Sequence, residues 1–236
     1  FAKYKEHKIA EQTILGLTLA DYITTTTEHF ADKIKEHNPN VLVLPNSIDV
    51  TQPQFESKRT QSMNGVRFGW IGGVYHTPDI RLMYEGLKDV FKSCSHSKFQ
   101  MCLGGYGANQ TYQNLEMLFT DFYKNIKDKK YLEDLSKNIE LGSVAQPYVR
   151  LWGKSVFNYA ELYNDIDVAL VPLVENSFNS YKSQIKIIEA GFFKKAVIVS
   201  NVMPYTIDCK KHNSILVSPS KRNEGRTQRR GYSNKM

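Results

Sequence analysis

The chain has 236 residues, of which 41% are hydrophobic, and it carries a formal net charge of +7 at pH 7. Its length predicts one large domain or one domain with part of another, and no apolar run approaches the roughly 20 residues of a membrane-spanning helix. Residues 220–236 hold six basic residues and one acidic residue, so the other 219 residues carry only +2, which argues against nucleic-acid binding by the folded part.

The first 50 residues predict two helices and two strands in alternation. Residues 4–20 have a helical pattern, residues 21–25 predict a short strand, and Thr27 is a suitable N-cap for a helix over residues 28–36. Residues 41–44 predict a buried strand. Residues 50–64 are polar and contain Pro and Gly, so they predict a linker or a domain boundary.

A second α/β series begins at Val66. Residues 66–71 predict a strand, Pro78 favours a helix from Thr77 to about Phe91, and residues 99–103 predict the next strand. Residues 108–138 predict one or two helices. The remaining expected elements are strands at 149–153, 167–173, 196–200 and 215–217, and helices at 159–163 and 182–193. This alternation predicts an α/β fold with a Rossmann-like parallel sheet and helices on both faces.

Two glycine-rich turns follow expected strands. In GWIGGVYH, Gly72 and Gly73 would let backbone N–H groups approach a phosphate, although the segment matches neither G-x-G-x-x-G nor a P-loop. A tight turn that needs a positive φ explains the glycines equally well. His76 could donate to a phosphate or a sugar hydroxyl, but an isolated loop histidine is usually a surface residue. We interpret GGYG at residues 104–107 as structural, because ANQTYQ is a poor helix start.

The segment FNSYKSQIKIIEAG follows the apolar run at residues 166–173 and predicts a helix start at a strand's C-terminal end. Open α/β sheets bind anions there. Lys182, Lys186 and Glu189 would share one side of this helix. With the Ser183 hydroxyl, Lys182 could bind a diphosphate, and Glu189 could accept both hydroxyls of a ribose. The core stripe would be Ile185, Ile188 and Phe192.

A simpler reading of the same segment is a solvated helix face on which Lys186 and Glu189 form an i,i+3 ion pair. The sequence leaves these two interpretations open. It contains no recognisable serine-hydrolase arrangement, no H-E-x-x-H and no carboxylate-rich metal run. Asp165 and Asp167 are expected to mark a strand entry.

Cysteine usage and the chain ends add expectations about context. The three cysteines are scattered and form no C-x-x-C motif, which favours a reducing, cytoplasmic setting and argues against structural zinc. The chain begins at Phe1 and shows no signal peptide, so we expect a missing N-terminal part. Residues 220–236 are expected to be a disordered, solvated tail, with contact to phosphates or a membrane surface as the alternative.

Three stretches resemble the GT-B glycosyltransferases, specifically family 4, also called group 1. They are ADYITTTTEHFADKIKEHNPNVLVLPNSID, VRFGWIGGVYHTPDI and NYAELYNDIDVALVPLVENSFNSYKSQIKIIEAGFFKKAVIVSNVMPY, which lie roughly within residues 20–80 and 150–217. The resemblance implies three parts. Residues 1–60 would end the N-terminal acceptor lobe and include a linker, residues 61–219 would form the C-terminal nucleotide-sugar-binding lobe, and residues 220–236 would be the tail.

The resemblance implies transfer of a sugar from a UDP-, GDP- or ADP-linked donor to an acceptor hydroxyl. Transfer would proceed with retention, with no cofactor and no obligatory metal. The acceptor would be a glycan or a lipid-linked molecule, as in polysaccharide biosynthesis, with no nucleic-acid partner. We expect a cytoplasmic protein that could associate peripherally with the inner face of the membrane. The chain alone would be inactive without the rest of its acceptor lobe, and a non-catalytic nucleotide- or sugar-binding module is the alternative.

The resemblance also assigns donor-binding residues. Glu189 falls on the glutamate that binds the donor ribose, and Gly72 and Gly73 fall on the loop that faces the diphosphate. Lys182 and Ser183 fall in the turn before that glutamate.

Two positions depart from the family pattern. Tyr181 stands where the E-x7-E motif has its first glutamate, and Gly73 stands where an arginine is common. The positive charge for the leaving diphosphate would then come from Lys182 and Lys186, with His76 as a further candidate. The sequence assigns no other catalytic residue.

Overall fold

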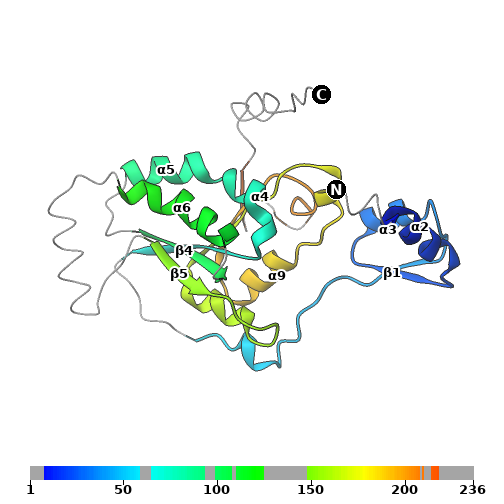
Figure 1. The fold of residues 1–236 in the computed structure, drawn as a ribbon. Helices are drawn as coiled ribbons and strands as arrows, with labels where there is room; N and C mark the ends of the chain where they lie inside the picture. The colour runs from blue at the N-terminus through cyan, green and yellow to red at the C-terminus, as the bar shows by residue number, and fades with distance from the viewer. Residues whose placement is uncertain are drawn as a thin grey trace, which may run out of the picture.

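The computed structural model describes residues 8–58, 65–93, 99–107, 110–124, 148–207, 209 and 214–217. Expectations for residues 1–7, for most of the linker's second half, for residues 125–138 and for the tail at 220–236 lie outside the described residues. The described chain forms a small N-terminal unit, residues 8–47, and a larger α/β lobe that starts near residue 53 (Figure 1).

The N-terminal unit contains four elements, which are α2 (Ile9–Leu19), β1 (Ile23–Thr25), α3 (Glu28–Ile34) and β2 (Val41–Val43). Strands β1 and β2 pair in parallel. The predicted N-cap is confirmed, because the Thr27 hydroxyl accepts the Phe30 N–H at 3.2 Å. The expectation that residues 41–44 are buried is wrong. Leu42 and Leu44 are each more than half exposed, because no described element covers them.

The lobe is built on a six-stranded sheet in which every neighbouring pair is parallel. In spatial order its strands are β5 (Tyr148–Trp152), β4 (Phe99–Tyr106), β3 (Val66–Ile71), β6 (Val168–Val171), β7 (Ala196–Ser200) and β8 (Ile215–Val217). The chain therefore starts in the middle, winds to one edge and then returns to build the other half. This is the doubly wound order of Rossmann folds, and it confirms the predicted fold class.

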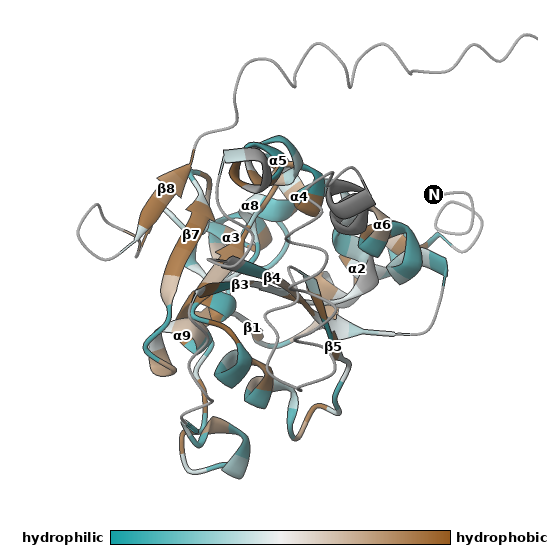
Figure 2. Ribbon diagram, turned by 90° about the vertical axis from the view of Figure 1, so that its left-hand side faces the viewer, coloured by the Kyte–Doolittle hydropathy of each residue, from teal (hydrophilic) through white to brown (hydrophobic). Residues whose placement is uncertain are grey.

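Helices cover both faces of the sheet. One face carries α4 (Thr77–Arg81), α5 (Tyr84–Ser93) and α6 (Gln110–Lys124), and the other carries η3 (Tyr159–Asp165) and α9 (Ile185–Phe192). Figure 1 shows α5 and α6 side by side above the sheet. Each face has its own apolar core, and the strands that separate them include the strongly hydrophobic β7 and β8 (Figure 2).

Two local predictions in this lobe are corrected. The single helix expected from Thr77 to Phe91 is two helices, because the chain turns at Leu82 and Met83 between α4 and α5. The view of ANQTYQ as a poor helix start is also wrong, since α6, which lies within the region expected to be helical, begins at Gln110. Leu115 of this helix is fully buried against the sheet, and such burial outweighs a weak local helix start.

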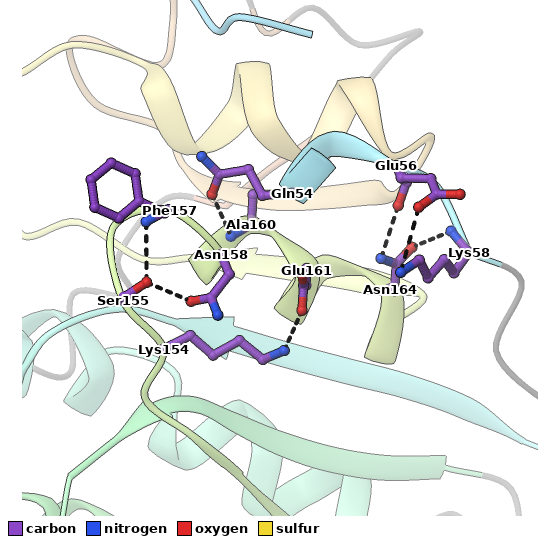
Figure 3. A network of polar contacts seen from close by, with 10 residues as sticks. All are labelled: Gln54, Glu56, Lys58, Lys154, Ser155, Phe157, Asn158, Ala160, Glu161 and Asn164. Atoms are coloured by element: carbon purple, nitrogen blue, oxygen red, sulfur yellow. Dashed lines mark hydrogen bonds and ion pairs between the residues drawn. The ribbon is translucent and has the colours of Figure 1, made fainter. Parts of the chain in front are cut away.

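The segment expected to be a linker is attached to the lobe over residues 53–58. It forms the short helix η1 (Pro53–Phe55), whose Phe55 ring enters the lobe core. The Asn164 side chain joins two of its backbone groups, accepting the Lys58 N–H at 2.9 Å and donating to the Glu56 carbonyl at 3.2 Å (Figure 3). These residues therefore belong structurally to the lobe.

Arg67 and Asp167 form an ion pair at the end of the sheet where the strands begin. The guanidinium contacts one carboxylate oxygen at 2.8 Å and the other at 3.1 Å, and the Arg67 N–H adds a third bond at 2.9 Å. The structural role predicted for Asp167 is confirmed. The candidate site lies at the opposite end of the sheet, where the strands end.

Candidate functional site

The candidate site lies where β3 and β6 end next to each other. These two central strands pair directly, and the segments that follow them lead to helices on opposite faces of the sheet. In open α/β sheets this divergence opens a crevice beyond the strand ends, which is the usual ligand position. The loop after β3 contains Gly72 and Gly73, and the loop after β6 leads to the segment around Lys182.

Gly72 packs tightly in the first loop. Its N–H donates to the Gly104 carbonyl at 3.2 Å, and its carbonyl accepts the Tyr112 hydroxyl at 2.8 Å. A Cβ at this position would lie 2.7 Å from the Trp70 ring and 2.8 Å from the Lys186 amine. Close packing therefore requires this glycine, and the Gly72 N–H is already used within the fold.

Gly73 is open by comparison. Nothing lies within 4 Å of a Cβ added there, and its φ of −88° is accessible to any residue. The described residues offer no acceptor for its N–H. The positive φ that the sequence suggested for this turn is wrong, because among the described glycines the positive φ belongs to Gly105, which lies at an irregularity within β4 rather than in a turn after it. Gly105 also passes close to the Gly72 carbonyl, which confirms that GGYG is structural.

Lys186 places its amine at the centre of the site. The amine lies 5.0 Å from the centre of the Trp70 ring and next to Gly72. Among the described residues it makes no ion pair and no hydrogen bond. Burial lowers the pKa of this amine to about 8, although the charges of Glu189 and Asp79 act in the opposite direction. The site therefore holds a half-buried cation, and no described residue forms an ion pair with it.

Lys182 and Ser183 lie before this helix rather than on it. The segment forms the short helix α8 (Ser177–Ser180), a turn over residues 181–184, and then α9. The shared helix face predicted for Lys182, Lys186 and Glu189 is therefore wrong. The Lys182 amine lies 5.2 Å from the Phe178 ring centre, and the Ser183 hydroxyl accepts a hydrogen bond from the Asn46 amide.

Glu189 is buried, with 5% of its surface exposed. One carboxylate oxygen accepts the Tyr159 hydroxyl and the other accepts the Tyr163 hydroxyl at 2.9 Å. Burial raises the pKa of both tyrosines, so both hydroxyls remain protonated donors. The interpretation of this segment as a solvated face with a Lys186–Glu189 pair is therefore wrong. Each carboxylate oxygen still has capacity for one further hydrogen bond.

The core stripe of α9 also differs from the prediction. Ala190 and Phe193 belong to the buried cluster on this side of the sheet, with Ile187 packed against them. Of the predicted stripe, Phe192 contacts that cluster, and its ring meets Phe55 at 5.6 Å. The buried face of α9 differs from the predicted one because the hydrogen bonds of Glu189 to the two tyrosines place this residue in the interior.

His76 forms a contact that the sequence did not indicate. Its Nδ1 lies 2.8 Å from a carboxylate oxygen of Asp79, which is nearly fully buried. The other Asp79 oxygen accepts the Val174 N–H at 2.7 Å. Burial raises the pKa of Asp79, but these bonds together outweigh it and leave the pKa below its ordinary value. The H-x-x-D spacing was the only available signal, and the partner at Val174 lies 95 residues away.

The N-terminal unit touches the turn that carries Lys182. The ring of Tyr181 stacks on His29, with centroids 5.0 Å apart, and on Phe30 at 5.3 Å. His29 also lies 3.3 Å from the Ser180 hydroxyl. Tyr181 therefore forms part of the contact between the two units.

The described residues contain neither a candidate metal cluster nor a candidate membrane span. No group of three or more His, Cys, Asp or Glu side chains there could hold a metal ion. None of the helices in that part of the chain has the length and apolar character needed to cross a bilayer.

Comparison with solved structures identifies the class of fold. The chain matches sucrose-phosphate synthase from Thermosynechococcus elongatus with a TM-score of 0.57 and 15% identity, covering 92% of this chain and 50% of that one. It matches Anabaena Alr3699/HepE in complex with UDP and glucose with a TM-score of 0.55 and 13% identity, covering 85% and 50%. The chain thus has the fold of GT-B glycosyltransferases.

A third similar structure is a mutant of S. aureus TarM in complex with fondaparinux, alpha-GlcNAc-glycerol and UDP, with a TM-score of 0.57 and 15% identity. The match covers 38% of that chain and 92% of this chain. The chain therefore spans at most about half the length of these three structures. No protein-family model matches it, and a search of curated proteins finds no significant match. Membership of family 4 remains a prediction from the sequence.

Proposed function

We propose that this chain is the donor-binding part of a glycosyltransferase, which transfers a sugar from a nucleotide-sugar to an acceptor hydroxyl. The observation that carries the proposal is the Lys186 amine, which lies beside Trp70 and Gly72 at the end of β3 with no anion bound to it from the described residues. A half-buried cation is costly unless an anion compensates it. A nucleoside diphosphate is an anion of suitable charge for this position.

The neighbouring groups supply complementary contacts to such a ligand. Lys182 adds a second positive charge, and the Gly73 N–H is a donor that no described residue uses. Glu189 can use its remaining lone pairs for the ribose hydroxyls, and the two tyrosines fix its orientation. The Ser183 hydroxyl can donate while it accepts from Asn46. Charge compensation of the departing diphosphate would then lower the barrier to transfer.

The finer features of the reaction are proposed from the sequence resemblance. They are retention of anomeric configuration, independence of metal, a glycan or lipid-linked acceptor, and action in the cytoplasm at the inner face of the membrane. The acceptor hydroxyl would approach from the side of the N-terminal unit, which contacts the lobe at Tyr181.

The proposal is tested by calorimetric titration of the full chain with UDP, GDP and ADP, each with and without Mg²⁺. We expect one diphosphate to bind saturably and with equal affinity in both conditions. Glu189→Gln should weaken this binding by about 1–3 kcal/mol, because a ribose hydroxyl loses a charged acceptor. Gln can still accept from one tyrosine through its amide oxygen and can donate to the hydroxyl oxygen of the other, which limits damage to the fold.

The matched control is Glu36→Gln, which neutralises an exposed glutamate paired with Lys33 and should leave the affinity unchanged. Absence of binding by all three nucleotides would overturn the proposal. A strict need for Mg²⁺ would overturn metal independence alone. Binding without transfer, in a protein that has a complete acceptor lobe, would instead favour a non-catalytic binding module.

A further inference from the structure

Two tyrosines hold the carboxylate of Glu189, one at each oxygen. The Tyr159 hydroxyl donates to one oxygen and the Tyr163 hydroxyl donates to the other, the second at 2.9 Å. Burial raises the pKa of both hydroxyls, so each keeps the proton that it donates. The Tyr163 hydroxyl also lies 3.5 Å from the Lys186 carbonyl, but the shorter contact directs its proton toward Glu189. The carboxylate is therefore fixed at two points.

The rings of both tyrosines are themselves held in place. Tyr163 is 3% exposed, and its ring stacks on Phe193 with centroids 5.6 Å apart and planes 14° apart. Tyr159 is half-buried and packs against the same core. Because a packed ring has few rotamers open to it, each hydroxyl reaches only a small region, which includes one oxygen of Glu189. The orientation of the carboxylate therefore follows from the packing of the two rings.

The helix η3, which carries both tyrosines, is attached near each end to the segment that precedes the lobe. Near its start, the Ala160 N–H donates to the Gln54 side-chain oxygen at 3.4 Å. At its other end, Asn164 bonds to the backbone of Glu56 and Lys58 (Figure 3). The two tyrosines thus project from an element that cannot rotate without breaking hydrogen bonds at both ends.

This arrangement determines how many hydrogen bonds Glu189 can still accept. A carboxylate has about four lone-pair positions, shared equally between its oxygens. The tyrosines fill one position on each oxygen, and no other described residue donates to this side chain. The two vicinal hydroxyls of a ribose supply one donor for each oxygen, whereas a deoxyribose leaves one position of a buried group unpaired. Such a site rejects the analogue that lacks a hydroxyl, because an unpaired buried acceptor is costly.

We propose that Tyr159 and Tyr163 are positioning residues that make the candidate site selective for ribonucleotides over deoxyribonucleotides. They direct one free lone pair of each Glu189 oxygen toward one hydroxyl of the ribose. The inference rests on the proposed function and deepens it, because it states which residues determine recognition of the sugar attached to the base. Both tyrosines act through Glu189, so their effect should appear in the choice of nucleotide.

The test compares one nucleotide with its 2′-deoxy counterpart by calorimetry on the full chain, using whichever of UDP, GDP or ADP binds. The wild type should prefer the ribonucleotide by about 10- to 100-fold, because the deoxy form leaves one oxygen of Glu189 short of a donor. Tyr159→Phe and Tyr163→Phe keep the rings and remove one hydroxyl each. In each variant the preference should fall by about fivefold through weaker binding of the ribonucleotide, with affinity for the deoxynucleotide changing less than about twofold.

Tyr106→Phe is the matched control, because it removes a tyrosine hydroxyl near a different carboxylate, that of Glu116, in the core on the other face of the sheet. It should leave the preference unchanged. A merely structural role of Tyr159 or Tyr163 would lower stability in urea unfolding, or weaken binding of both nucleotides equally, without altering the ratio of their affinities. Because Tyr159 is half-buried, Tyr159→Phe carries the test even if the variant at the buried Tyr163 does not fold.

The outcomes separate this inference from the proposed function. An unchanged ratio in the tyrosine variants, or an equal loss of affinity for both nucleotides, would overturn the positioning role and leave the proposed function standing. Equal binding of the two nucleotides by the wild type would overturn ribose selectivity, while diphosphate binding at Lys186 would still support the donor-site proposal. If no nucleotide binds, the proposed function fails and this inference fails with it.

Discussion

The two ends of the sheet differ in whether a buried charge has a hydrogen-bonded partner of opposite sign. Where the strands begin, Arg67 donates two guanidinium hydrogen bonds and one backbone N–H bond to Asp167, and this pairing lowers the pKa of the carboxyl. Where the strands end, the Lys186 amine has no anion bound from the described residues, and burial lowers its pKa to about 8. A hydrogen-bonded ion pair supports the fold, whereas a buried cation that Glu189 and Asp79 only partly compensate costs stability, and the proposed ligand would offset this cost.

The sharpest test of this contrast is Lys186→Met, which keeps the apolar stem and removes the charge. We expect nucleotide affinity to fall by about 10- to 100-fold, because a charge-assisted contact to phosphate is lost. The free energy of unfolding should stay constant or rise, since the folded state no longer holds an unpaired cation. Calorimetry and urea unfolding measure the two quantities. Lys88→Met, at a surface lysine near Glu85, is the control. Unchanged nucleotide affinity in Lys186→Met would contradict the proposed difference between the two ends of the sheet.

The same amine predicts that stability depends on pH. The unfolded chain keeps Lys186 protonated up to about 10.5, whereas the folded protein releases this proton near pH 8. Between these values the unfolded state binds more protons, so the free energy of unfolding rises with pH. From about pH 8 to 9.5 the rise should be about 1–2 kcal/mol in the wild type and absent in Lys186→Met. Equal pH slopes for the two proteins in urea unfolding would exclude the effect.

Removing a charge at the other end of the sheet, where Arg67 and Asp167 pair, should instead lower stability and leave nucleotide binding intact. Asp167→Asn should lower the free energy of unfolding by about 1 kcal/mol, a value discounted because this carboxylate is 40% exposed, and should leave nucleotide affinity unchanged. The Arg67 hydrogen bonds lower the pKa of Asp167, so its contribution is full above the unfolded value of 3.8 and is lost as pH falls through the folded value. A variant that unfolds normally but binds nucleotide poorly would show that the two ends are not independent.

The sequence predicted those features of the fold that depend on local pattern. The strands of the sheet, the Thr27 cap and the order of elements follow from hydrophobic periodicity and turn residues, and each is confirmed. The break between α4 and α5 and the start of α6 were missed, because packing on the sheet outweighs local propensity there.

The two loops assigned to the candidate site do lie together, but their internal geometry differs from the prediction. Lys186 and Gly72 do meet, as their positions after adjacent strands suggested. The burial of Glu189 depends on Tyr159 and Tyr163, which lie 30 and 26 residues earlier. No local pattern encodes such long-range contacts, so these tyrosines could not be assigned from one sequence.

The attachment of residues 53–58 to the lobe has a mechanical consequence. Because this segment is fixed and Ile48 also packs against the lobe core, a rotation of the N-terminal unit would have to be absorbed before Ile48, at a hinge within residues 45–47. That unit also touches the Lys182 turn through contacts to Tyr181 and Ser183. A change in the angle at the hinge would therefore shift Lys182 relative to Lys186, so that the spacing of the two cations depends on how far the two units are closed.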